Sequence, residues 1–172
     1  MMRFFISAIC FLFVFMFETS FLSSLPSILS LTPLILGLSI YLLQSYGLID
    51  GFIWMCVYGI FLNTFHFSTI PFVSLAWIMA GIVASVMARH VFSNRSFYGS
   101  VACAYCGFFA LVLTESLLAW SAYFVRGSFI DWSDFFFTHL LRAFLLLLVM
   151  TVLFACTRRI RNLLPHPFPF RT

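Results

Sequence analysis

The sequence predicts an all-α integral membrane protein: a compact bundle of six transmembrane helices with both termini in the cytoplasm. The first observation is composition. Apolar residues make up 63% of the 172 residues and charged residues only 8%, against roughly 45–50% and about 25% in soluble domains. So few charges cannot cover a soluble surface, and a chain this apolar is not disordered. The second observation is length: six spans of about 20 residues leave only short loops, so residues 1–172 are predicted to form a single polytopic membrane domain.

The first three predicted spans come from two apolar runs. Residues 4–25 form the first. An apolar run after an early basic residue is also typical of a signal peptide, but no small-residue cleavage site follows, and we interpret the run as a retained span. The second run, residues 31–65, would make a helix of roughly 50 Å, longer than a bilayer core of about 30 Å. Gly47 and Gly51 supply turn residues at its middle, so we divide it into two short spans, 31–46 and 51–65.

Three further apolar runs predict the remaining spans at residues 70–88, 97–124 and 135–156. A polar hinge separates the first two, and Ser93 or Asn94 is the candidate N-cap of the helix that follows. A short polar loop precedes the last span. Residues 157–172 begin with arginines and end in prolines at every second position. Because proline lacks the backbone N–H that a helix needs, we expect an extended cytoplasmic tail.

The arginines support this division into spans. All nine basic residues are arginine. In the six-span arrangement only Arg126 falls on the outer side and only Arg142 lies within a span. The remainder lie on the inner side: Arg3, Arg89, Arg95, Arg158, Arg159, Arg161 and Arg171. Basic loops stay in the cytoplasm, so the formal net charge of +4 indicates membrane orientation and not nucleic-acid binding. The predicted location is the bacterial cytoplasmic (inner) membrane, which the chain crosses several times.

Small residues form two stripes on neighbouring predicted spans. Such stripes let helix backbones approach closely, which is how membrane helices associate. We therefore predict a helix-packing role, and not a ligand site, for Ala76, Ala80, Ala84, Ala88, Gly99, Cys103 and Gly107. Cys103 and Cys106 also form a C-x-x-C pair, but no second pair or nearby histidine completes a familiar metal spacing. Buried packing is favoured for the cysteines, and redox or metal chemistry is the alternative.

Four polar residues lie where apolar ones are expected: Glu18, Glu115, His139 and Arg142. A charge at the centre of a membrane helix costs about 2.5–3.5 kcal/mol on the insertion scale and usually has a partner. Counted from the outer ends of their spans, the two glutamates and Arg142 lie at similar depths, roughly 10–14 Å. The hypothesis is a polar cluster in the outer leaflet, in which Arg142 bridges Glu115 and also Glu18. A structural ion pair is favoured; a contact with a partner and a proton or substrate pathway are the alternatives.

Residues 59–72, GIFLNTFHFSTIPF, resemble the turn between spans three and four of the rod shape-determining protein MreD family. That family shows a glycine, an acidic residue four positions later and a proline before a small or aromatic residue. Here Gly59, Asn63 and Pro71 match these positions, with asparagine where the family often has aspartate. The small-residue helix that follows, the basic hinge and Glu115 are also similar to MreD, and the resemblance covers about residues 4–157.

The resemblance implies a non-enzymatic scaffold of the bacterial cell-elongation machinery that helps to maintain rod shape. It implies partners of three kinds besides membrane lipid: an MreC-like bitopic coiled-coil protein, MreB-like filaments and peptidoglycan synthases. It also implies a fold similar to the substrate-binding subunits of energy-coupling-factor transporters. The residues themselves show no nucleophile–base pair, phosphate loop or metal quartet, so we expect no catalytic site, cofactor or metal. The alternative is a small transporter or vitamin-binding membrane subunit, with the polar cluster as its binding site.

Overall fold

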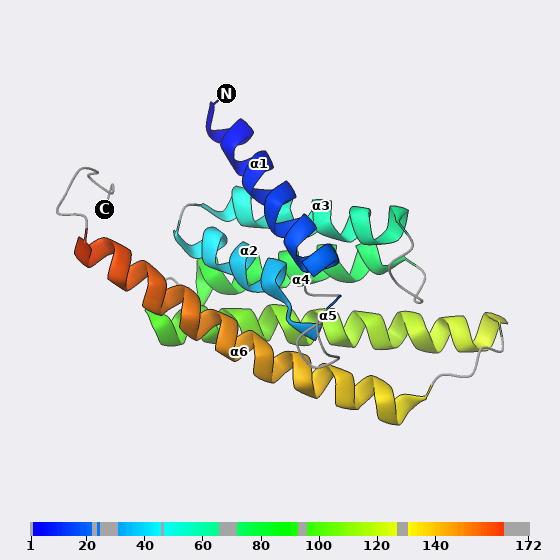
Figure 1. Ribbon diagram of the computed structural model, residues 1–172. Helices are drawn as coiled ribbons and strands as arrows, with labels where there is room; N and C mark the ends of the chain where they lie inside the picture. Colours follow the sequence, from blue (N-terminus) through cyan, green and yellow to red (C-terminus); the bar gives the residue numbers. More distant parts are fainter. Residues whose placement is uncertain are drawn as a thin grey trace.

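The computed structural model (Figure 1) describes residues 2–21, 24, 31–45, 47–65, 72–92, 96–126 and 131–163. Within these residues the chain is all-helical and has six α-helices. Their bounds are α1 (Met2–Met16), α2 (Leu34–Ser45), α3 (Leu48–Thr64), α4 (Val73–His90), α5 (Phe97–Arg126) and α6 (Trp132–Leu163). A short π-helical turn, η1 (Phe17–Phe21), continues α1. The all-α prediction is therefore confirmed, and residues 31–65 form two helices joined at Gly47 instead of one.

Helix lengths differ more than the predicted spans do. Three helical segments are long and apolar enough to cross a membrane: Val73–His90, Phe97–Phe124 and Trp132–Arg159. The other apolar helices are shorter. Helix α2 has 12 residues, so it is only about 18 Å long at about 1.5 Å per residue. The chain thus has the helices of a membrane protein, while the crossing of the bilayer by all six stays a prediction.

Several helix ends differ from the prediction. Helix α3 begins at Leu48, so Gly51 lies inside it and not in a turn. Ser96 caps α5, because its hydroxyl oxygen accepts the N–H of Gly99 at 3.2 Å. This cap replaces the predicted candidates, both of which lie outside the described residues. Helix α6 continues to Leu163, so the start of the predicted tail is helical and not extended. Apolar residues and good helix formers continue through this stretch, and the prolines come only later.

Helices α2, α3, α4 and α5 pack in sequence order, each against the next, and form the centre of the molecule. Helix α6 runs back across α5 to reach α2, and α1 lies at the edge against α2 and α3 (Figure 1).

All seven residues of the predicted packing stripes are buried. Cys103 and Ala84 show how close the α4–α5 contact is: the Cys103 thiol donates to the Ala84 carbonyl at 3.3 Å. This contact gives Cys103 a packing role.

Aromatic rings and one hydrogen bond hold α1 against α3. Phe11 and Phe15 are buried, and Phe11 meets the ring of Trp54 edge-on at 5.4 Å between centroids. The indole N–H of Trp54 donates to the Ser7 hydroxyl at 2.9 Å. Since α1 otherwise makes few contacts with the bundle, this bond is a large part of its polar attachment.

We expect Ser7→Ala to destabilise the protein by about 1 kcal/mol, because it leaves the buried Trp54 N–H without an acceptor. The measurement is the midpoint of chemical unfolding in detergent micelles, followed by tryptophan fluorescence. Ser121→Ala is the matched control, since the exposed Ser121 hydroxyl bonds only to the Leu118 carbonyl of its own helix. Equal effects of the two substitutions would contradict the proposed attachment.

Candidate functional site

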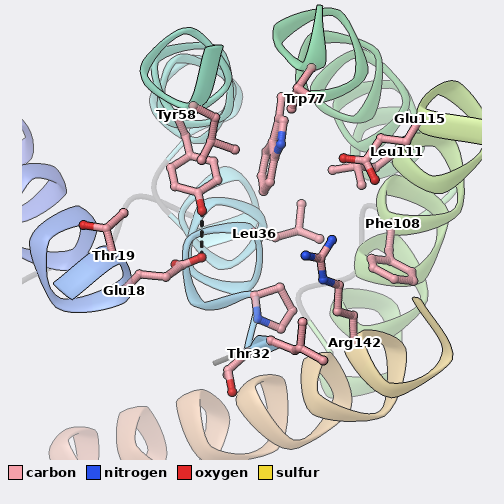
Figure 2. A pocket seen from close by; sticks show the side chains of 14 residues that line it. Glu18, Thr19, Thr32, Leu36, Tyr58, Trp77, Phe108, Leu111, Glu115 and Arg142 are labelled. Carbon is pink, nitrogen blue, oxygen red and sulfur yellow. Dashed lines mark hydrogen bonds between the residues drawn. The ribbon is translucent and has the colours of Figure 1, made fainter. Parts of the chain in front are cut away.

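A cavity of about 230 Å³ lies among the helices. Helices α2 to α6, the η1 turn and the residues just before α2 all contribute to its wall (Figure 2). The reason for a cavity here is the different length of the helices. Helix α1 ends in the η1 turn, and α2 starts only at Leu34. Helices α5 and α6 continue past the height of these two ends, so their side chains there face an incompletely filled space. Three of the four predicted polar residues line the cavity: Glu18, Glu115 and Arg142.

The η1 turn places the Glu18 carboxylate at the start of α2. One oxygen accepts the backbone N–H of Ile35 at 2.8 Å, and the other accepts the Tyr58 hydroxyl at 2.9 Å. The first N–H groups of a helix have no partner within the helix, and the positive end of the helix dipole attracts an anion. Glu18 therefore acts as a cap for α2 supplied from a distant part of the chain.

Arg142 points into the cavity from α6, with Leu36 on one side and Phe108 on the other (Figure 2). Among the described residues, no carboxylate oxygen lies within 4.0 Å of its guanidinium nitrogens. The predicted direct bridge from Arg142 to Glu115 and Glu18 is therefore wrong in this structure. The physical reason is that both carboxylates have nearer partners: Glu18 bonds to α2 and α3, and Glu115 faces His139, which lies on α6 one turn before Arg142. Arg142 shares the cavity with both glutamates without contacting either of them.

Glu115 instead faces His139. Their closest atoms, Glu115 Oε2 and His139 Nε2, are 3.5 Å apart, and each residue is 6% exposed. The imidazole ring packs against Phe135 at 4.3 Å between centroids. Its other nitrogen, Nδ1, is buried and has no hydrogen-bond partner in the described part of the chain. His139 also lines an apolar groove of about 600 Å³ between α5 and α6, so the pair stands between this groove and the polar cavity.

A double-mutant cycle separates the two possible pairs. We expect Glu115→Gln and His139→Gln to be coupled by about 1–2 kcal/mol, because contacting buried groups share one interaction. The coupling of Glu115→Gln with Arg142→Met is expected to be smaller, since no direct contact joins them. Unfolding in micelles gives the free energies of the four proteins in each cycle. A larger coupling with Arg142 would contradict the observed arrangement.

Sequence reasoning missed one functional partner in this cavity. Tyr58 was not singled out, yet its hydroxyl holds Glu18. A signal existed, because a tyrosine inside an apolar span needs a hydrogen-bond partner for its hydroxyl. The position of Glu18 gave no hint of which tyrosine this would be.

The MreD-like turn is described only in part. Gly59 packs tightly on α4: a Cβ at this position would lie 2.7 Å from the Cβ of Trp77 and 3.1 Å from the Cα of Ser74. Asn63 is exposed in the last turn of α3. Pro71 lies outside the described residues.

Comparison of the chain with protein-family models, curated proteins and solved structures finds no match.

Proposed function

We propose that the protein is a non-enzymatic scaffold of the bacterial inner membrane, of the MreD type, that helps to maintain rod shape during cell elongation. In this role it links an MreC-like coiled-coil protein with MreB-like filaments and peptidoglycan synthases, directly or indirectly. The observation that carries the proposal is the residue pattern around Gly59 and Asn63. The close approach of α3 and α4 at Gly59 leaves no room for a side chain, and Asn63 is exposed at the end of α3. The tight packing at Gly59 supports the glycine of the family pattern, and the exposure of Asn63 leaves its side chain free to meet a partner.

The scaffold proposal includes six crossings with both termini in the cytoplasm. Reporter fusions test it: a green fluorescent protein, which folds only in the cytoplasm, is expected to fluoresce at either end of the chain. Alkaline phosphatase, which is active only outside the cytoplasm, is expected to be active when inserted after residue 126 and inactive at the two ends. An active phosphatase at one end would show an odd number of crossings and contradict the arrangement.

The experiment that tests the function is depletion of the protein in its host, followed by microscopy of cell shape. We expect the cells to become round and to lose wall insertion along their sides. Wild-type protein restores the shape, whereas the strongly destabilised variant Gly51→Ala is expected to restore it poorly. Crosslinking in the same cells is expected to capture a bitopic membrane protein with a coiled coil. Unchanged cell shape and wall insertion after depletion would overturn the elongation role.

The cavity favours one second candidate, a substrate-binding subunit of a small transporter. A bundle with a polar cavity at its centre is what such a subunit needs. However, about 230 Å³ is below the range of roughly 300–1,000 Å³ for drug-sized ligands, which argues against a vitamin. Mass spectrometry of small molecules that purify with the protein distinguishes the two functions, since a stoichiometric vitamin would favour the transporter.

A further inference from the structure

The charges around the cavity are not all neutralised by one another. Glu18 is satisfied, because each of its oxygens accepts a hydrogen bond from the protein. Glu115 directs Oε2 to His139, and its residue also lines the cavity. Arg142 contributes a guanidinium, and among the described residues it has no ion-pair partner. One guanidinium and one incompletely paired carboxyl group therefore face the same small space.

Each of these groups selects a chemical partner. A guanidinium presents five N–H donors in a planar fork that matches the oxygens of a phosphate or carboxylate. A carboxylate attracts an ammonium group, and the face of an indole or phenyl ring adds to that attraction. Trp77 and Phe108 line the cavity beside Arg142 and Glu115 (Figure 2). A molecule that carried only one charge would satisfy one of the two groups and leave the other unpaired in an apolar bundle, which is costly.

The size of the cavity limits the ligand. A volume of about 230 Å³ corresponds to about eight water molecules at roughly 30 Å³ each. A group of about eight non-hydrogen atoms therefore fills the cavity, and a nucleotide or a vitamin would have to extend beyond it.

We propose that this cavity binds a small zwitterion, with its phosphate or carboxylate at Arg142 and its ammonium at Glu115. Two sources provide this chemistry, a free small molecule and the ethanolamine head group of a membrane lipid. The binding site stands on the cavity itself and does not depend on the scaffold role. Loss of zwitterion binding would thus leave the proposed function untouched, and unchanged cell shape after depletion would leave the binding site untouched.

The test uses the full chain in a nonionic detergent, with O-phosphoethanolamine as the probe. Ligand binding stabilises the folded state, so millimolar probe is expected to raise the melting temperature by about 3 °C or more. Inorganic phosphate alone and ethanolamine alone are expected to give less than a third of this shift. No shift with the zwitterion, or an equal shift with phosphate alone, would overturn the proposal.

Variants connect the shift to the cavity. Arg142→Lys keeps the charge but loses the fork, and we expect at least a tenfold weaker apparent affinity for the probe. Glu115→Gln is expected to reduce the response to the zwitterion while leaving the small response to phosphate. Asp134→Asn is the matched control, because Asp134 is exposed at the start of α6 and lies outside the cavity lining. Full binding by both cavity variants would overturn the assignment.

A lipid arm identifies the source. The protein is reconstituted into phosphatidylcholine vesicles or into vesicles that contain phosphatidylethanolamine. If the lipid head group is the ligand, phosphatidylethanolamine is expected to abolish the shift produced by free phosphoethanolamine. If a free molecule is the ligand, the shift is expected to persist in both. Both results support a zwitterion site, whereas absence of the shift in phosphatidylcholine vesicles would count against it.

Discussion

Gly51→Ala is expected to destabilise the protein by about 3 kcal/mol or more, a large fraction of the roughly 5–15 kcal/mol that keeps a protein folded. A Cβ at residue 51 would overlap the Ser39 carbonyl oxygen, and it would lie 2.6 Å from the Leu43 Cβ and 2.7 Å from the Leu43 backbone nitrogen. Backbone atoms cannot move aside as the end of a flexible side chain can, so α2 and α3 would have to separate. Overpacking of a close interface usually costs about 1–3 kcal/mol, and contact with the backbone places this site at the top of that range. Yield of monodisperse protein and the unfolding midpoint in micelles measure the effect.

Gly107→Ala provides the matched control for this prediction. Its Cβ would lie 3.3 Å from the Ala84 Cβ, a distance that a small shift can relieve. Alanine also favours the helix over glycine by about 0.5–1 kcal/mol. The two effects oppose each other, and we expect a change in unfolding free energy of less than about 1 kcal/mol. If Gly51→Ala were as mild as Gly107→Ala, the close packing of α2 on α3 would be wrong.

Glu18→Ala is expected to cost about 3 kcal/mol of stability. The substitution leaves two donors without an acceptor, the Ile35 N–H and the Tyr58 hydroxyl. Hydrogen bonds to charged groups contribute about 1.5–3 kcal/mol each, and the effects of neighbouring groups are not fully additive. The unfolding free energy in micelles is the measurement. Glu18→Gln keeps one acceptor oxygen, so we expect it to lose about half as much.

Two comparisons make this prediction specific. Tyr58→Phe removes one of the two bonds, and in the Glu18→Ala background we expect it to cost little more. Asp134→Ala removes an exposed carboxylate from the start of α6 and is expected to change stability by less than about 1 kcal/mol. Additive losses in the Glu18 and Tyr58 variants would contradict the shared hydrogen bond.

The helices were predicted well from the sequence because an apolar run and the glycines that interrupt it can be recognised from neighbouring residues alone. The division of residues 31–65 followed from the length of the apolar run and from the glycines at its middle, and the structure has two helices there. The ends were predicted less well. Gly51 looked like a turn residue, yet it is helical because the small residue is needed for close packing on α2. A glycine has the same appearance in a sequence whether it serves a turn or a helix contact.

The polar site was predicted in its members but not in its pairing. Depth along each span brought Glu18, Glu115 and Arg142 to one level, and all three line the cavity. Depth does not fix the rotation of a helix about its axis. That rotation directs His139 to Glu115 and leaves Arg142 in the cavity. The π-helical turn at Glu18 also cannot be deduced from composition, because it depends on how α1 meets α2 and α3.

The return of α6 to α2 has a consequence for the order of assembly. Helices α3, α4 and α5 each pack on the helix made just before them, so these contacts can form before α6 is made. The contact of Val149 with Gly37 joins segments far apart in the chain and forms only after the last helix is made. Until then Glu115 lacks His139, and the cavity lacks Arg142. Helix α6 therefore brings both the imidazole that faces Glu115 and the guanidinium of the cavity. A chain cut short before residue 139 would carry the Glu18 and Glu115 carboxyl groups without either one.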